Sequence, residues 1–152
     1  MQHLFEITRT SRNTLEKFLD VYTTEQLNTI PPGFSNNLIW NIAHIIVVQQ
    51  MLVYKLAGLP MMISDEMVEK YKRGTRPEGD ISAEEIAEVR LLLYTTIDQT
   101  ETDFTSGKFA QYHEFTTMSG FTIRSASEAT AFNIYHEAVH TGMMMSIRKF
   151  FN

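Results

Sequence analysis

The sequence contains no cysteine, and this absence excludes several kinds of site at once. Without thiols the chain forms neither disulfide bonds nor zinc and iron–sulfur centres that depend on thiolate ligands. It also has no thiol nucleophile of its own. Any metal bound by this chain must therefore be held by histidine, aspartate or glutamate, and any thiol used in its chemistry must come from outside the protein.

Positive charge is scarce as well, because 18 acidic residues outnumber 13 lysines and arginines and give a net charge of −5. A protein that binds nucleic acid by neutralising phosphates usually carries the opposite sign, so we expect no nucleic-acid partner. The first residues, Met1 to Glu6, lack the basic stretch and the apolar run of a signal peptide. This favours a cytoplasmic location.

Sustained alternation of apolar and polar residues, which is typical of strands, is also missing, and helical periodicity dominates. The pattern predicts four long helices, over about 2–21, 36–56, 82–104 and 125–150. Two capping boxes, Ser82 with Glu85 and Ser125 with Glu128, mark the beginnings of the third and fourth. The chain of 152 residues suits one domain over 1–152. We therefore predict an all-α fold, a single four-helix bundle.

Two long connections separate these helices. Residues 59–81 carry Pro60 and three further glycines and prolines around a short helical piece from Ser64 to Arg73. A connection of this length can cross a whole bundle, so the second and third helices need not be antiparallel. Residues 105–124 are rich in aromatic side chains, and we expect short extended pieces there.

Formal charge is absent from Gln26 to Tyr54, and the second predicted helix is apolar on nearly all sides. A transmembrane span is the rival interpretation. Polar side chains such as Asn41, His44 and Gln49 would find no partners in lipid if this helix crossed alone. We therefore predict a buried central helix, no membrane contact, and one face of this helix against another subunit.

Three histidines suggest a metal site. His136 and His140 share one helical face, because a helix turns by about 100° per residue. His44 lies in the uncharged second helix, where a buried imidazole without a partner costs about 1–3 kcal/mol and a metal ion would satisfy it. Three histidine ligands leave a coordination position open, as catalytic sites do. We predict that His44, His136 and His140 bind one divalent metal ion.

Other interpretations of these residues exist. The segment 136–140 matches H-E-x-x-H, the zinc-peptidase pattern in which Glu137 would be the general base. Those enzymes take a third ligand from downstream, and residues 141–152 contain no histidine and no acidic residue. We therefore expect the match to be accidental and Glu137 to be solvated or ion-paired. The remaining alternative is that each histidine is packed or solvated without an ion, as we expect for His3 and His113.

Asparagines lie about one turn from the predicted ligands. Asn37 and Asn41 precede His44, and Asn133 precedes His136. Such side chains can orient an imidazole by accepting a hydrogen bond from it. Helix capping and core packing explain them equally well.

The segment from Asn37 through Trp40 to His44 resembles the second-helix motif of the DinB-like metalloenzyme family, and His136 with His140 resembles its fourth-helix pair. The likeness covers essentially the whole chain. It implies an up-down-down-up bundle with a long crossover between helices 2 and 3, often assembled as a homodimer. It also implies a divalent ion, such as zinc, nickel, manganese or iron, held by the same three histidines.

Characterised members of that family use low-molecular-weight thiols in S-transfer or isomerisation reactions. The resemblance therefore implies a metal-dependent thiol S-transferase, with a small-molecule substrate and an external thiol as cofactor. A metal-dependent hydrolase and a non-catalytic, stress-associated metal-binding protein are the alternatives, since all three would share the ligands. A cleft with room beside the ion would favour an enzyme, and a site sealed by Trp40 and methionines would favour the third class.

Overall fold

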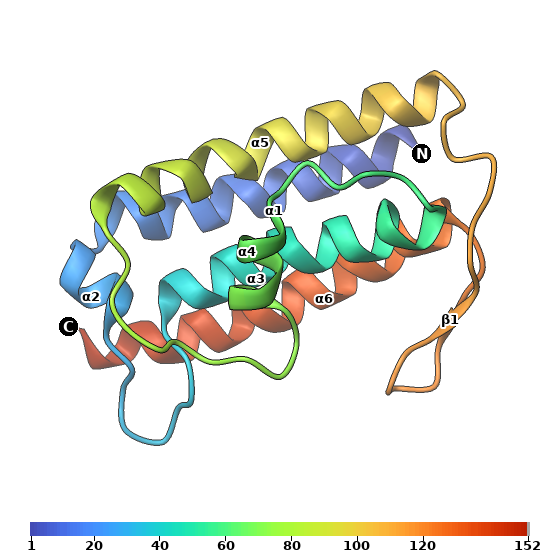
Figure 1. Ribbon diagram of the computed structural model, residues 1–152. Helices are drawn as coiled ribbons and strands as arrows, with labels where there is room; N and C mark the ends of the chain where they lie inside the picture. Colours follow the sequence, from blue (N-terminus) through green and yellow to red (C-terminus); the bar gives the residue numbers. More distant parts are fainter. Residues whose placement is uncertain (152) are drawn as a thin grey trace.

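The computed structural model describes residues 1–151 and is helical along most of its length (Figure 1), which confirms the all-α prediction. The long helices are α1 (Gln2–Val21), α3 (Leu38–Val53), α5 (Ala83–Thr105) and α6 (Ala126–Ile147). The short ones are α2 (Thr24–Asn28), α4 (Asp65–Tyr71) and the 3-10 turns η1 (Lys55–Ala57) and η2 (Arg148–Phe150). Strands β1 (Phe115–Thr116) and β2 (Thr122–Ile123) form an antiparallel hairpin.

The four long helices lie side by side, and α1 and α6 run in one direction while α3 and α5 run in the other (Figure 1). Helix α3 packs most extensively against α6, and α1 packs against α5 and α6. The connection that joins α3 to α5 carries α4, which packs against α3 (Figure 1). It leads back along α3, so that two consecutive long helices can run in the same direction, an outcome that the length of the connection allowed.

The helix ends follow local capping, with small differences from prediction. The box of Ser82 and Glu85 is complete, because each residue's side chain accepts a hydrogen bond from the other's backbone N–H. The second box is half formed: Ser125 caps α6, but the carboxylate of Glu128 accepts the N–H of Arg124 instead. Asn37 is the N-cap of α3, so this helix begins slightly later than the predicted start near residue 36. Helix α2 was not predicted.

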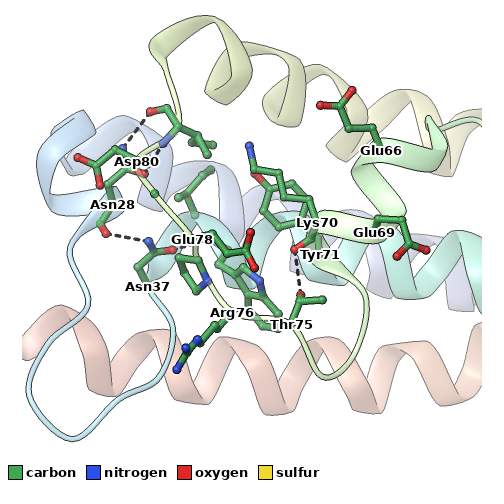
Figure 2. Close-up of a pocket in the computed structure, with 15 residues that line it drawn as sticks. Asn28, Asn37, Glu66, Glu69, Lys70, Tyr71, Thr75, Arg76, Glu78 and Asp80 are labelled. Atoms are coloured by element: carbon green, nitrogen blue, oxygen red, sulfur yellow. Dashed lines mark hydrogen bonds between the residues drawn. The ribbon is translucent and has the colours of Figure 1, made fainter.

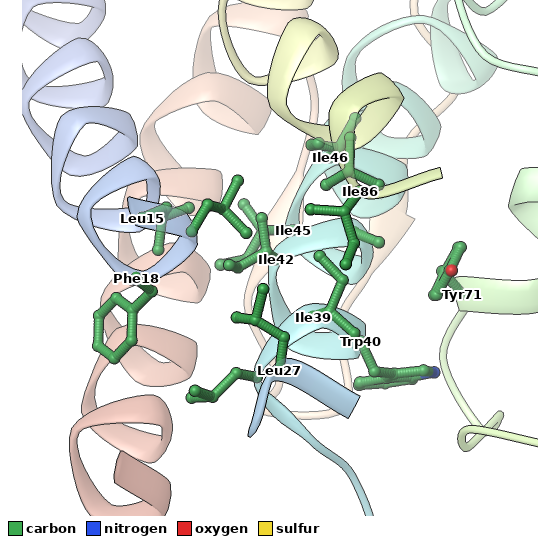
Figure 3. Packing of buried hydrophobic residues seen from close by; sticks show 14 of the residues in the cluster. Leu15, Phe18, Leu27, Ile39, Trp40, Ile42, Ile45, Ile46, Tyr71 and Ile86 are labelled. Atoms are coloured by element: carbon green, nitrogen blue, oxygen red, sulfur yellow. The ribbon is translucent and has the colours of Figure 1, made fainter. Parts of the chain in front are cut away.

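Helix α3 forms the centre of the core. Its side chains are buried except for Val48 and Met51, which are half-buried. Figure 3 shows Ile39, Ile42, Ile45 and Ile46 of this helix packed among apolar side chains from α1, α2, α4 and α5. Burying such a side chain contributes about 1.5–3 kcal/mol. The expected contact of α3 with another subunit is not met, because the chain's own helices cover it.

The span Leu38–Ala57 is long and apolar enough to cross a membrane. However, 83% of its most apolar window is buried inside the protein. This burial is typical of the core helix of a soluble protein, and it explains why so few charges occur in this part of the sequence.

The rotation of α6 differs from prediction. Glu137, expected to be solvated or ion-paired, is completely buried, whereas the apolar Val139 is 47% exposed. Glu137 accepts hydrogen bonds from Nε and Nη2 of Arg12, at 3.1 and 2.7 Å, so it is ion-paired and not solvated. Apolar residues surround α6 almost evenly, so hydrophobic periodicity could not fix which side faces inward.

Candidate metal centre

The structure brings His44 of α3 together with His136 and His140 of α6. The ring centroids are 5.2 Å apart for His44 and His136, 4.7 Å for His44 and His140, and 4.5 Å for His136 and His140. One ligand nitrogen of each ring lies within 4.8 Å of the other two. Since a Zn–N bond is about 2.0–2.1 Å, small ring rotations suffice for a shared ion. The three residues could therefore hold one metal ion.

The ring of His44 is held from two sides. Its Nδ1 lies 2.6 Å from the backbone carbonyl oxygen of Tyr71. A carbonyl oxygen only accepts, so Nδ1 carries the hydrogen and Nε2 keeps its lone pair for a ligand role. Trp40 stacks on the ring with centroids 4.6 Å apart and planes inclined by 13°. These contacts fix both the tautomer and the orientation of His44.

The ring of His140 is oriented by an asparagine. Its Nδ1 lies 2.7 Å from Oδ1 of Asn41. The amide nitrogen of Asn41 donates to the carbonyl oxygen of Asn37 and to Oδ1 of Asn36, so Oδ1 is left to accept from the ring. Asn41 therefore has the orienting role considered for it. Asn37 instead caps α3 by accepting the N–H of Trp40.

His136 lacks such a partner. Its Nδ1 is buried and forms no hydrogen bond with any residue of the described range 1–151. Asn133, which was considered as its orienting residue, donates to Glu137 instead. An unpaired buried nitrogen of this kind costs about 1–3 kcal/mol, which a bound ion or water would recover. The donor set of three imidazoles and the unpaired nitrogen both fit a divalent ion.

The environment keeps all three imidazoles neutral. Burial lowers the pKa of His136 to about 3, and repulsion from His140 and His44, whenever these are protonated, and from Arg12 acts in the same direction. Burial, aided by His44, lowers the pKa of His140 to about 4. Burial also lowers the pKa of His44, although the hydrogen bond to Tyr71 opposes it. Neutral imidazole is the form that binds metal, so no protons need to be displaced near neutral pH.

A cavity of about 300 Å³ opens beside the histidines. His44 and His136 form part of its lining, and its other walls come from α3, α6, the β1–β2 hairpin and the end of the α4 segment. Those walls consist of Val48, Met51, Leu52, Arg73, Phe115, Thr117, Met118, Ser119 and Phe132. Among residues 1–151, no acidic side chain lines the cavity. Glu137 is outside it and bound to Arg12, so the general base required by the peptidase interpretation is missing.

A larger cavity of about 430 Å³ (Figure 2) is lined in part by Trp40 and Tyr71. It is lined mainly by polar and charged residues of α4 and the following connection, and by Asn28 and Asn37, which are hydrogen-bonded to each other. None of the three clustered histidines lines it. The chemistry that the histidines offer therefore belongs to the smaller cavity.

The two remaining histidines lie elsewhere. The side chain of His3 is 93% exposed, with its ring 3.0 Å from Glu6, and His113 is exposed in the segment before β1. Both are solvated, as predicted. Sequence patterns did not identify the carbonyl of Tyr71 or the side chain of Arg73 as parts of the site. A backbone carbonyl carries no residue signature, and Arg73 reaches the cavity only through the path of the connection.

A helical protein that brings imidazoles from two packed helices together beside a cavity belongs to the class of bundles that can hold a metal in their core. Residues 7–144 match the DinB superfamily, and the chain belongs to that family. The resemblance inferred from its histidine motifs is thereby confirmed. No curated protein matches the chain significantly.

Proposed function

We propose that this protein is a divalent-metal-dependent enzyme that acts on small molecules, with the ion held by His44, His136 and His140. The observation that carries the proposal is that three neutral imidazoles share one space that opens into a cavity. A structural metal site is closed, whereas a catalytic site keeps room beside the ion. Zinc, nickel and iron suit imidazole ligands, whereas manganese, which the family resemblance also implies, prefers oxygen ligands.

A bound divalent cation lowers the pKa of a thiol or water next to it and so provides a nucleophile near neutral pH. The chain contributes orientation and mainly apolar surroundings: Tyr71 and Trp40 hold His44, Asn41 holds His140, and most of the cavity wall is apolar. With no carboxylate in the cavity, the site offers no general base for activating water. This favours a thiol S-transferase that uses an external low-molecular-weight thiol, and leaves a metal-dependent hydrolase as the alternative.

The non-catalytic, stress-associated role is disfavoured by the same geometry. Trp40 covers one face of His44, but the cavity leaves space at His44 and His136 that a sealed site would not have. We further propose an up-down-down-up four-helix bundle, supported by the chain directions in Figure 1, and a homodimer located in the cytoplasm. The exposed face of α6, which carries no charge, supports the homodimer.

The test of metal binding is elemental analysis of protein purified without chelator. We expect a single divalent ion per chain in the wild type, and loss of most of it in His44→Ala and His140→Ala. His113→Ala removes a solvated histidine and is the matched control, with unchanged metal content. Equal metal content in all four proteins would contradict the ligand assignment.

The test of the reaction class uses the metal-loaded protein with an activated aryl halide and several small thiols. We expect the thiol to be consumed faster with the wild type than with His140→Ala. Ester hydrolysis without any thiol requirement would instead support the hydrolase. Equal rates for the wild type and the variant in both assays would contradict an enzymatic role for the site.

A further inference from the structure

We propose that the cavity beside the histidines takes a small molecule that combines an apolar body with a carboxylate, and that Arg73 binds the carboxylate. This inference rests on the proposed function, because it names the substrate class for the same site. Neither the family nor the three histidines specify it. It comes from the composition of the cavity and the surroundings of one arginine.

The walls of the cavity favour an apolar body. Val48 and Leu52 of α3 and Phe132 of α6 present hydrocarbon to it, and Phe115 adds an aromatic ring from the hairpin. A volume of about 300 Å³ is at the lower limit for ligand sites, so the ligand must be small. Burying apolar surface against these walls would supply most of the binding free energy.

Arg73 is the feature that specifies charge. Arg73 follows α4 and is exposed. Its guanidinium contacts the sulfur of Met118, a residue of the hairpin loop. Met118 is itself 79% exposed. These exposures place Arg73 at the mouth of the cavity. Within the described residues Arg73 forms no ion pair, in contrast to Arg9, Arg12 and Arg90. A guanidinium without a carboxylate partner, beside a cavity without acidic residues, is complementary to a carboxylate ligand.

The larger cavity provides a comparison within the same protein. It also has an arginine, Arg76, but this cation is accompanied by carboxylates in the lining, and Lys70 is paired with Glu85 at 2.6 Å. The acidic residues of that lining are Glu66, Glu69, Glu78 and Asp80. Positive charge is therefore balanced there and unbalanced at Arg73, although the protein as a whole has a net charge of −5.

Arg73 shares its cavity with two of the histidines. Since His44 and His136 line the same cavity, a ligand whose carboxylate binds Arg73 and whose body lies on the apolar walls also lies beside these two rings. The substrate class is therefore a small carboxylic acid with an apolar body.

The experiment compares phenylacetate with its neutral analogue phenylacetamide on metal-free protein at about pH 8, above the ordinary histidine pKa. Binding is read by calorimetry and by the fluorescence of Trp40, the single tryptophan, which stacks on His44. We expect the wild type to prefer the carboxylate by roughly tenfold or more, the factor typical of a hydrogen bond to a charged group. Arg73→Gln should abolish the preference, and Arg73→Lys should keep part of it. Arg76→Gln is the matched control and should bind like the wild type.

Equal affinity for the two probes in the wild type, failure of both to bind, or the same loss in Arg76→Gln would overturn the inference. Because no metal is present, the result is independent of the elemental analysis. A wild type that binds metal but shows no preference for the carboxylate refutes the role of Arg73 alone. A protein that binds the carboxylate through Arg73 but holds no metal refutes the proposed function alone.

Discussion

At the scale of single residues, the site depends on which nitrogen of each imidazole is free. The carbonyl of Tyr71 and the amide oxygen of Asn41 each accept a hydrogen bond from a ring, so His44 and His140 present Nε2 to the shared space. The sequence predicted the three histidines, because their spacing places them on helices that can face each other. It also suggested Asn41, one turn from His44, but it could not distinguish the orienting role from packing.

Asn41→Leu should weaken metal binding by about 10- to 100-fold, because the ring of His140 loses the acceptor that orients it. The dissociation constant is measured by competition with a chelator of known affinity. Asn41→Asp keeps an oxygen acceptor at the same position and should retain most of the affinity. Equally tight binding by Asn41→Leu would show that this hydrogen bond does not orient the ligand.

Metal-free protein should lose stability on acidification. Folding lowers the pKa of His136 to about 3 and that of His140 to about 4, so below about pH 6.5 the unfolded chain binds protons that the folded chain does not. The contribution of these histidines to the free energy of unfolding should be fully present above about pH 6.5. Below that pH it should fall by about 1.4 kcal/mol per pH unit for each such histidine, until the pH reaches the pKa of the folded state. Urea unfolding in the presence of chelator measures this slope. His136→Gln should flatten it, and an unchanged slope would contradict the assignment.

At the scale of elements, the pair of Arg12 and Glu137 joins α1 to α6 directly behind the histidines. Both side chains are almost completely buried, at 0% and 1% exposure. The sequence did not predict this pair, because the rotation of α6 cannot be read from a helix with apolar residues on all sides. The pair explains why an H-E-x-x-H pattern occurs here without a peptidase: the glutamate serves helix packing.

Glu137→Gln should therefore destabilise the fold by about 3–5 kcal/mol, since it leaves a buried guanidinium without its countercharge. Glu101→Gln is the matched control, because Glu101 pairs with Arg9 across α1 and α5 but both side chains are 36% exposed. The control should cost at most about 1 kcal/mol. Urea denaturation measures both. Loss of activity in Glu137→Gln at unchanged stability would favour the general-base role instead.

At the scale of the whole molecule, the helical class, the long helices and the crossing connection followed from periodicity, capping residues and loop length. The path of the connection did not, and it is this path that carries Tyr71 to His44 and Arg73 to the cavity. The burial of α3 by its own chain also moves the expected subunit contact to another surface. Helix α6 exposes an uncharged face with Tyr135, Val139 and Met145, beside Ile7 of α1.

We predict a homodimer that buries this face of α6. Light scattering coupled to size-exclusion chromatography should give twice the chain mass for the wild type and the monomer mass for Val139→Glu, because a charge placed in an apolar interface is costly. Leu91→Glu changes an apolar residue that is 64% exposed on α5 and should remain dimeric. A monomeric wild type would contradict the homodimer, and a dimeric Val139→Glu would place its interface elsewhere.

Anomalous scattering at the absorption edge of the bound metal shows whether three imidazoles from α3 and α6 hold one cation. We expect a single peak at bonding distance, about 2.0–2.3 Å, from one nitrogen each of His44, His136 and His140. A peak at other side chains, or none among these rings in crystals of metal-loaded protein, would contradict this expectation.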